Sequence, residues 1–354
     1  MRWRWLVRKE LTWSRHQVAT LLLVLVVLPG LSAFTALGFQ HVLPEDTPVA
    51  VVPGEDTTED EVKIVTAALA SFSDPVRYDD EDRALAAMDR ERVYAVVTVP
   101  PGLTNESANV TLTMYRDGNM KPYERPAQAL AGILDRTLSG LVPAEVHVRA
   151  VEVGPDRTLS QYLVPTFVMA LVLVLSLAYL PYVLVREAAV VDRVRFESSL
   201  SAVVGGKVGT FTVLGVVPVV VAAGTSAYIG YGISLLSPGA LLVYALTALY
   251  TAAFGAAVAV FARFEPWGRL ANLAALLFLF AFAGIVYPAG FFSVVRRELV
   301  RLVPLHYSMI AARSHVLRGA SIADLGVEYA IVGATTVASL ALLWGSLRLY
   351  ERRA

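Results

Sequence analysis

The chain has 354 residues, of which 56% are hydrophobic and only 17% are charged, and its mean hydropathy is +0.58. This composition is too apolar for a soluble globular protein, and it excludes disordered and nucleic-acid-binding chains. The net charge is zero. Residues 40–160, however, contain 21 acids and 11 bases, which leaves 30 − 21 = 9 acids and 30 − 11 = 19 bases elsewhere. An acidic segment of net charge −10 is therefore inserted in a basic chain of net charge +10.

Hydropathy predicts several helices that cross a membrane. A bilayer core of about 30 Å needs roughly 20 apolar residues per helix. Stretches without a charged residue occur at residues 17–40, 158–185, 208–262, 270–295 and 329–347. The 55-residue stretch holds two helices that turn near residues 230–239. We predict an α-helical polytopic membrane protein with about six transmembrane helices and an inserted α/β external domain.

The distribution of basic residues predicts the orientation. Short loops rich in Arg and Lys remain cytoplasmic. Three segments are basic: the one before residue 17, the one between residues 186 and 207 and the one after residue 347. We therefore expect a plasma-membrane protein with both termini in the cytoplasm and residues 40–159 outside the cell. One group of basic residues contradicts this rule by falling on the outer side: Arg296, Arg297, Arg301, Arg313 and Arg318.

The first apolar stretch resembles a secretory signal peptide, but its 24 residues exceed the usual 7–15 of that signal, and no A-x-A cleavage site follows. A retained signal anchor is the favoured interpretation. In the acidic segment, residues 49–52, 93–99, 110–115 and 146–153 have the pattern of strands. Residues 59–72 and 122–138 have that of amphipathic helices.

Two features of the acidic segment can be interpreted either as functional sites or as ordinary structural features. Residues 79–82 form a run of four carboxylates that suggests a cation site. The favoured alternative is a helix start, where acids complement the helix dipole. Asn105 and Asn109 begin N-x-[ST] sequons on the predicted outer side, and the sequence does not decide whether they are glycosylated.

The sequence offers no catalytic chemistry. Gly205-Gly206-Lys207 lacks the following Ser or Thr of a phosphate loop. His306 and His315 lack the i, i+4 spacing of a helical metal pair. No G-x-S-x-G or H-E-x-x-H motif occurs, and the spans carry no Asp, Glu, Lys, Arg or His for a proton or ion path. We therefore expect no catalytic site, no cofactor and no metal in this chain.

Two basic segments on the predicted inner face suggest another source of energy. Residues 1–16 place tryptophans and leucines on one face between arginines, as in a helix that lies on a membrane. Residues 184–207 alternate charges with helical apolar positions, as expected of a short helix docked on another protein. For both segments a generic basic flank of a membrane helix is the alternative.

At these residues the chain resembles the permease subunits of type 2 ABC exporters, and in particular the subgroup of sodium- and drug-extrusion permeases, which has a large external domain after the first span. The motifs that carry this resemblance are Lys9-Glu10, Arg186-Glu187, Phe196-Glu197-Ser198-Ser199-Leu200, Gly206-Lys207, Pro304-Leu305-His306-Tyr307, Arg313 and Arg318-Gly319. Ala188-Ala189 stands where the family has a second acid, and Val194-Arg195 where it has Gly-Thr.

The resemblance implies a role for each motif. Lys9 and Glu10 would belong to the interfacial helix, and Arg186, Glu187, Phe196, Glu197 and Lys207 to a coupling segment that engages a separate ATPase. Pro304, Tyr307 and Arg313 would belong to short helices that dip back into the membrane from outside, which explains the outer arginines because protein can bury re-entrant backbone. ATP and magnesium would bind the ATPase subunit. The expected partners are that ATPase, a second permease copy or homologue, and membrane lipids, with no nucleic acid.

The resemblance and the hydropathy together divide the chain into eleven parts. In order, these are a cytoplasmic interfacial helix (1–16), transmembrane helix 1 (17–39), the external α/β domain (40–159), transmembrane helix 2 (160–185), the cytoplasmic coupling segment (186–207), transmembrane helices 3 (208–230), 4 (239–262) and 5 (270–292), an external re-entrant segment (293–326), transmembrane helix 6 (327–347) and a cytoplasmic tail (348–354).

The function predicted from the sequence is that of an ATP-driven exporter permease that moves a substrate outward and hydrolyses nothing itself. The substrate stays open: uncharged spans favour lipid or amphipathic cargo, and the resemblance also allows sodium. The alternative is a membrane receptor or assembly factor whose external domain binds a ligand or partner.

Overall fold

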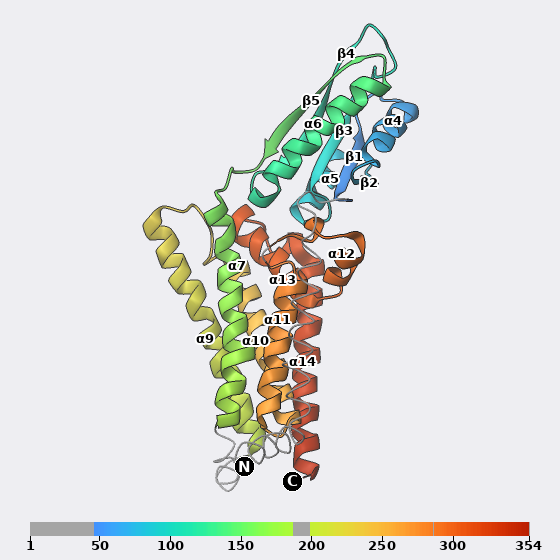
Figure 1. The fold of residues 1–354 in the computed structure, drawn as a ribbon. Coiled ribbons are helices and arrows are strands. Elements are labelled where there is room, and N and C mark those ends of the chain that lie inside the picture. Colours follow the sequence, from blue (N-terminus) through green and yellow to red (C-terminus); the bar gives the residue numbers. More distant parts are fainter. Residues whose placement is uncertain (1–45, 187–198, 286, 354) are drawn as a thin grey trace, which may run out of the picture.

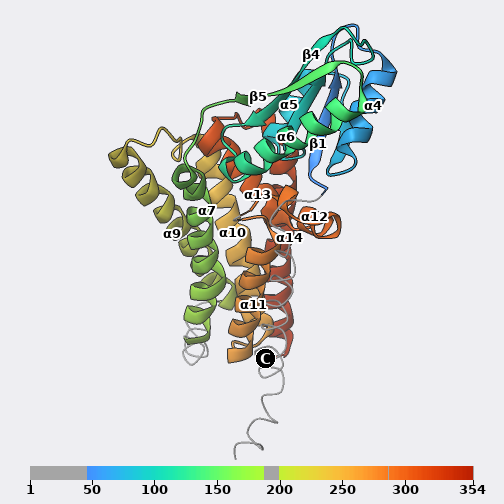
Figure 2. The same ribbon diagram turned by 45° about the horizontal axis from the view of Figure 1, so that its top comes forward.

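The computed structural model describes residues 46–186, 199–285 and 287–353. An α/β domain stands at one end of a bundle of long helices (Figures 1 and 2). Within the described part, four helices are long and apolar enough to cross a membrane: Leu159–Arg186, Leu200–Ile229, Pro238–Phe261 and Ala323–Arg352. A shorter apolar helix, Pro266–Phe282, lies among them. The predicted fold class is confirmed, while the predicted first span and interfacial helix lie outside the described residues.

The α/β domain is built on one five-stranded sheet. In chain order the strands are β1 (Pro48–Pro53), β2 (Asp74–Arg77), β3 (Ala95–Val99), β4 (Asn109–Asp117) and β5 (Glu145–Val153). Their spatial order is β2-β1-β3-β4-β5. β1 is parallel to β2 and β3, β3 is antiparallel to β4, and β4 is parallel to β5. The four predicted strands are confirmed, and β2 is an addition.

Helices cover both faces of the sheet at β1, and its residues Pro48 to Val52 are buried. Val49 and Val51 point into the core shared with α4 (Glu59–Leu69) and α6 (Glu124–Leu141), which follows the short helix η2 (Lys121–Tyr123). The alternate residues of β1 pack with α5 (Glu81–Asp89) on the other face. Strands with two buried faces read as continuous apolar runs, as β1 does. Asp80 caps α5, which confirms the structural reading of the acidic run.

Five long helices form the bundle in the described part of the chain. α7 (Leu159–Leu173) continues through the π-helix η3 (Val174–Tyr179) as far as Arg186. α9 (Leu200–Ile229), α10 (Pro238–Phe261), α11 (Pro266–Phe282) and α14 (Gly326–Arg353) complete it. α10 is central and packs against α7, α9, α11 and α14. Close approach depends on small residues, since a Cβ on Gly255 would lie 2.8 Å from the carbonyl oxygen of Ser176.

Between α11 and α14 the chain forms several short helices instead of continuing a span. The helix in the fifth predicted span begins at Pro266 rather than at residue 270 and ends at Phe282 rather than at residue 292. Gly284 then adopts a left-handed backbone with φ +64°, which ends the helical path. Next come η4 (Ala289–Phe291), α12 (Val294–Arg301), α13 (Pro304–Arg313), η5 (Ser314–Arg318) and η6 (Ala323–Leu325). Residues 289–318, which include all five outer arginines, are called the arginine segment below.

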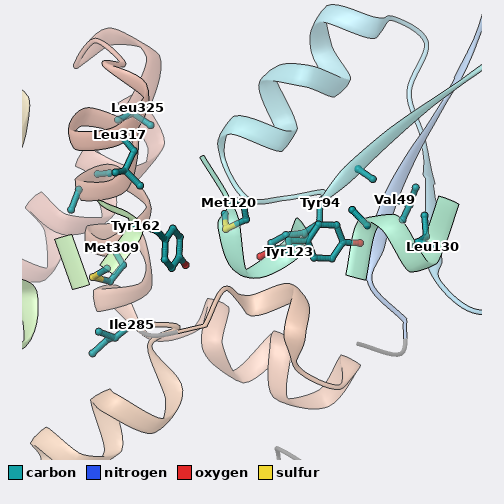
Figure 3. Close-up of a cluster of buried hydrophobic side chains, with 14 of the residues drawn as sticks. Val49, Tyr94, Met120, Tyr123, Leu130, Tyr162, Ile285, Met309, Leu317 and Leu325 are labelled. Atoms are coloured by element: carbon teal, nitrogen blue, oxygen red, sulfur yellow. The ribbon is translucent and has the colours of Figure 1, made fainter. Parts of the chain in front are cut away.

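The apolar core is continuous from the α/β domain into the bundle. One cluster of buried side chains includes Val49 and Leu130 of the domain and Met309 and Leu317 of the arginine segment (Figure 3). A second cluster fills the opposite end of the bundle, between α9, α10, α14 and the end of the α7 helix. The domain is thus packed directly on the bundle, and a short, mostly exposed segment, residues 154–158, connects β5 to α7.

Candidate functional site at the seam between the α/β domain and the bundle

The contact between the α/β domain and the arginine segment, called the seam below, concentrates most of the buried charge in the described part of the chain. The domain contributes the loop after α5, the end of β4 and the start of β1. The opposite surface is formed by η4, α12, α13 and η5, and Figure 2 shows α12 and α13 next to the domain. Acidic side chains on the domain meet arginines on the segment.

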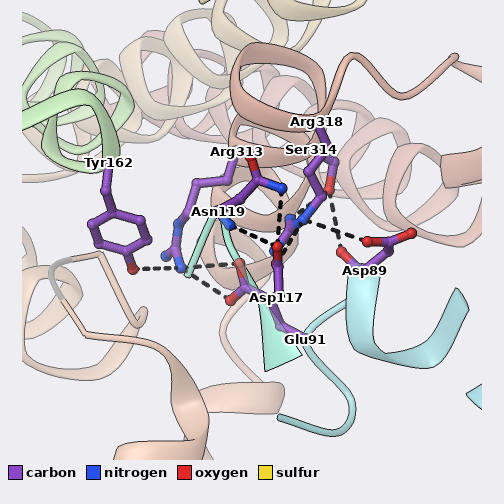
Figure 4. Close-up of polar contacts among 8 residues, drawn as sticks. All are labelled: Asp89, Glu91, Asp117, Asn119, Tyr162, Arg313, Ser314 and Arg318. Atoms are coloured by element: carbon purple, nitrogen blue, oxygen red, sulfur yellow. Dashed lines mark hydrogen bonds and ion pairs between the residues drawn. The ribbon is translucent and has the colours of Figure 1, made fainter. Parts of the chain in front are cut away.

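Arg313 is the most buried cation of the seam. Its Nη1 atom donates to both carboxylate oxygens of Glu91, each at 3.0 Å, and to the hydroxyl of Tyr162 at 3.1 Å (Figure 4). Its other terminal nitrogen donates to the carbonyl of Gly284. Only 1% of the Arg313 side chain and none of the Glu91 side chain is exposed. One guanidinium therefore joins the loop after α5, the first turn of α7, the end of α11 and α13.

Arg318 forms the second ion pair, with Asp117 at the end of β4. Its Nε donates to Oδ2 of Asp117 at 3.0 Å, and the other oxygen of this carboxylate accepts from the backbone and side chain of Asn119 at 2.8 and 2.9 Å (Figure 4). Burial alone would lower the pKa of Arg318, but Asp117 and Glu91 outweigh it, and the pKa is raised. Asp89 lies 3.7 Å away, and its own burial raises the pKa of that carboxyl. Arg318 therefore stays charged.

Arg297 extends the seam to β1 and β2. It donates to the carbonyl oxygen of Asp46 at 2.6 Å and to Oδ2 of Asp74 at 2.8 Å. Arg296 points away from the domain, stacks over the Phe292 ring at 3.9 Å and donates to the carbonyl of Ala281. Three of the five outer arginines thus pair with carboxylates of the acidic domain.

The apolar part of the seam is aromatic. The rings of Tyr94 and Tyr123 lie 5.5 Å apart, and Phe291 meets Tyr123 edge-on at 5.9 Å. Tyr94 packs so closely on Gly290 that a Cβ there would lie 2.3 Å from its ring. Aromatic contacts add specific geometry to apolar burial, so they fix the domain at a defined position.

The sequence predicted Pro304, Tyr307 and Arg313 as members of one functional segment. Pro304 occupies the first turn of α13, where a missing N–H carries no penalty. The Tyr307 hydroxyl donates to the carbonyl of Arg301 at 2.9 Å and so closes the turn between α12 and α13. Arg313 alone of the three reaches the domain. Whether this segment is re-entrant stays a prediction.

The residues predicted to couple to an ATPase lie at the other end of the bundle where they are described. Arg186 is exposed at the end of the α7 helix and donates to the Tyr182 hydroxyl at 3.4 Å. The guanidinium of Arg269, on α11, stacks over the same Tyr182 ring at 4.7 Å. Lys207 lies in the second turn of α9, whose cap is Ser199. Glu187, Phe196, Glu197, Lys9 and Glu10 lie outside the described residues.

Glu91, Asp117, Asp74 and Tyr162 were not predicted as site residues. Their positions carry no motif, and their partners lie more than 150 positions away. The available signal was electrostatic. A domain of net charge −10 adjoins a segment whose arginines violate the positive-inside rule, and opposite charges of this kind indicate a contact.

The fold and the seam define a multi-pass membrane protein with an α/β domain anchored on its helices. A family model described as ABC-2 family transporter protein matches residues 16–344, and the chain belongs to that family. It is a transmembrane permease subunit, the match includes no ATPase domain, and permeases of this family work with ABC ATPase subunits. No curated protein and no solved structure matches the chain.

Proposed function

We propose that this chain is the permease of an exporter in which a separate ATPase drives a substrate outward. The observation that carries the proposal is the polarity of the bundle within the ABC-2 family match. Four arginines lie at or near one set of helix ends, namely the end of the α7 helix, the end of α10, the start of α11 and the end of α14: Arg186, Arg263, Arg269 and Arg348. Figure 1 shows these helix ends opposite the α/β domain. By the positive-inside rule we infer that this end is cytoplasmic, since three of the five arginines at the other end pair with carboxylates of the α/β domain. The α/β domain is then external and both termini are cytoplasmic.

In this proposal the ATPase binds where residues 186–207 connect α7 to α9. Glu187 and Glu197 would contact the ATPase, Phe196 would add apolar contact, and Arg186 and Lys207 would border the segment. Lys9 and Glu10 would hold the interfacial helix against the same face. Two permease copies, or one copy and a homologue, would enclose the pathway. ATP and magnesium would be held by the ATPase, so this chain needs no cofactor of its own.

The arrangement supports a mechanical role for the chain. Closure of the ATPase would displace the α7 and α9 ends and favour one of two packings of the bundle. At the far end, Tyr162 on α7 and Arg313 on α13 hold the α/β domain to the moving helices. We expect the domain to follow the helices as a body. The subgroup, with sodium or an amphipathic molecule as the substrate, belongs to this proposal.

Purification of the chain from its native membrane in mild detergent tests the proposal. The expected result is co-purification of an ABC ATPase that is lost from the Glu197→Arg variant. Glu351→Arg is the matched control, because Glu351 is a carboxylate on the α14 end of the same membrane face. Recovery of intact chain with partners other than an ATPase would overturn the proposal in favour of a receptor or assembly factor.

A further inference from the structure

A cavity of about 470 Å3 lies beside the seam, and its lining includes the seam carboxylates Asp74 and Glu91. The α/β domain contributes β2 and the loop after α5, including Arg90 and Arg92. The bundle side contributes the α12–α13 turn and the first turn of α14, including Arg301 and Glu328. The volume is in the range of small-ligand sites in proteins.

Most charges that line this cavity are satisfied within the protein. Asp74 pairs with Arg297, Glu91 with Arg313 and Arg301 with Glu298. Arg90 donates to the carbonyl of Asp324 at 2.9 Å. These groups shape the walls, and their mutual pairing leaves little net charge to attract a simple ion.

Two opposite charges in the cavity have no such partner. Glu328 is only 3% exposed, yet it forms no hydrogen bond or ion pair with any residue in the described part of the chain. Arg92 is exposed at the rim and likewise has none among those residues. The Glu328 carboxylate oxygens are not among the fully buried side-chain atoms that lack a partner, so they are open to the cavity that this residue lines. A ligand that brings a cation to Glu328 and an anion to Arg92 would satisfy both groups with charge-assisted hydrogen bonds.

Several apolar side chains beside the cavity are exposed. Val327 lines the cavity and is 51% exposed. On α12, Val295 and Leu302 are 74% and 78% exposed, and Leu302 directly follows the lining residue Arg301. The apolar span of α14 begins at this level. Charged groups above an apolar helical surface match the boundary between headgroups and acyl chains.

We propose that this cavity binds the headgroup of a zwitterionic phospholipid with a primary ammonium group, from the leaflet next to the α/β domain. The ammonium donates hydrogen bonds to Glu328, and the phosphate accepts them from Arg92, with Arg301 as a second cation. The acyl chains cover Val327 and α12. The site goes beyond the proposed transport function, because it requires neither an ATPase nor transport of the lipid.

The test is native mass spectrometry of the purified full chain with phosphatidylethanolamine or phosphatidylglycerol at equal concentration. The wild type should retain phosphatidylethanolamine about tenfold better, as expected for one charge-assisted contact. Glu328→Gln should abolish this preference while phosphatidylglycerol binding remains. Arg92→Gln should weaken both lipids, and because Arg92 is exposed this variant keeps its fold. Glu106→Gln, an exposed carboxylate in the loop before β4, is the matched control and should behave as the wild type.

Two results would overturn the site. The first is an unchanged lipid preference in Glu328→Gln, and the second is a wild type without any preference. Free phosphoethanolamine is added in a separate arm. If it displaces the lipid at equal concentration, the ligand is a small soluble zwitterion and the lipid assignment is wrong. Because none of these measurements involves an ATPase, failure here and failure of the permease proposal are distinguishable.

Discussion

Arg313 and Glu91 are 222 positions apart in the chain and form an ion pair that solvent scarcely reaches. Glu91 belongs to the α/β domain, and Arg313 belongs to the helix that packs against α7, α10 and α14. A buried pair of this kind contributes little net stability compared with apolar residues, but it is strongly destabilising to break on one side. We therefore infer that the pair fixes the position of the α/β domain on the helix bundle.

Arg313→Met should lower the free energy of unfolding by about 3–5 kcal/mol, because it leaves the Glu91 carboxylate buried without its cation. Adding Glu91→Gln should recover part of the loss. Unfolding in mixed detergent micelles measures both. The matched control is Arg77→Met, which breaks an ion pair with Glu59 in which both side chains are largely exposed, and no measurable change is expected. Equal effects of Arg313→Met and Arg77→Met would contradict this account of the seam.

Gly290→Ala should destabilise the protein by about 1–3 kcal/mol, because the new Cβ would collide with the Tyr94 ring and force the seam apart. Gly132→Ala, on α6, is the control. No atom lies within 4 Å of its added Cβ, and a helical Gly→Ala change should stabilise by about 0.5–1 kcal/mol. Thermal unfolding followed by circular dichroism compares the two. The prediction fails if both glycines tolerate alanine equally.

Glu61 should make stability depend on pH in the acid range. Its carboxylate accepts from the N–H groups of Gly102 at 2.6 Å and Leu103 at 2.8 Å and from Thr58. Burial acts to raise the pKa of Glu61, but these hydrogen bonds outweigh it, and the pKa is lowered. The stabilisation is therefore fully present above the unfolded pKa of about 4.3 and is lost as pH falls through the lower folded pKa.

Glu61→Gln should accordingly cost about 1–3 kcal/mol at pH 7, and the difference from the wild type should vanish below the folded pKa of Glu61. Denaturation at several pH values between 7 and 2 measures this. Glu55→Gln, an exposed carboxylate nearby, should be neutral throughout. A deficit of Glu61→Gln that persists unchanged in acid would exclude the charge as its cause.

The proposed orientation predicts which introduced cysteines react from outside. The chain has no native cysteine, so labelling has no background. Ser107 and Leu236 are exposed on the α/β-domain side, and Glu265 and Glu351 are exposed at the opposite end. A membrane-impermeant maleimide on intact cells should label cysteines at the first two positions and spare the other two. The reverse pattern would invert the topology.

Local sequence pattern predicted most of the fold. The alternating or continuously apolar residues of β1, β3, β4 and β5 identify strands without knowledge of their partners. β2 escaped prediction because its four residues, Asp-Pro-Val-Arg, are short and contain a proline tolerated only at a sheet edge. The early end of α11 escaped because the apolar stretch continues past Gly284, whose backbone angle is not visible in hydropathy.

The seam was not predicted. The excess of acids in one segment and the misplaced arginines in another were the available signal, but the sequence analysis explained the arginines by a re-entrant segment. Which carboxylate meets which arginine depends on tertiary packing over more than 200 positions, as for Asp117 and Arg318. The hydroxyl of Tyr162 completes the Arg313 site from a third element, and no local pattern in the sequence marks it.

The helix from Leu159 to Arg186 links the two ends of the molecule, since Tyr162 meets the buried arginine and Arg186 borders the proposed ATPase contact. At 1.5 Å per residue its 28 residues extend about 42 Å. The π-helix η3 interrupts this path near its middle, and such wider turns occur frequently at functional sites. We expect η3 to deform when the helix is twisted. A rotation of the helix at Arg186 would then be smaller at Tyr162, whereas a displacement along the helix axis would be transmitted to Tyr162 in full.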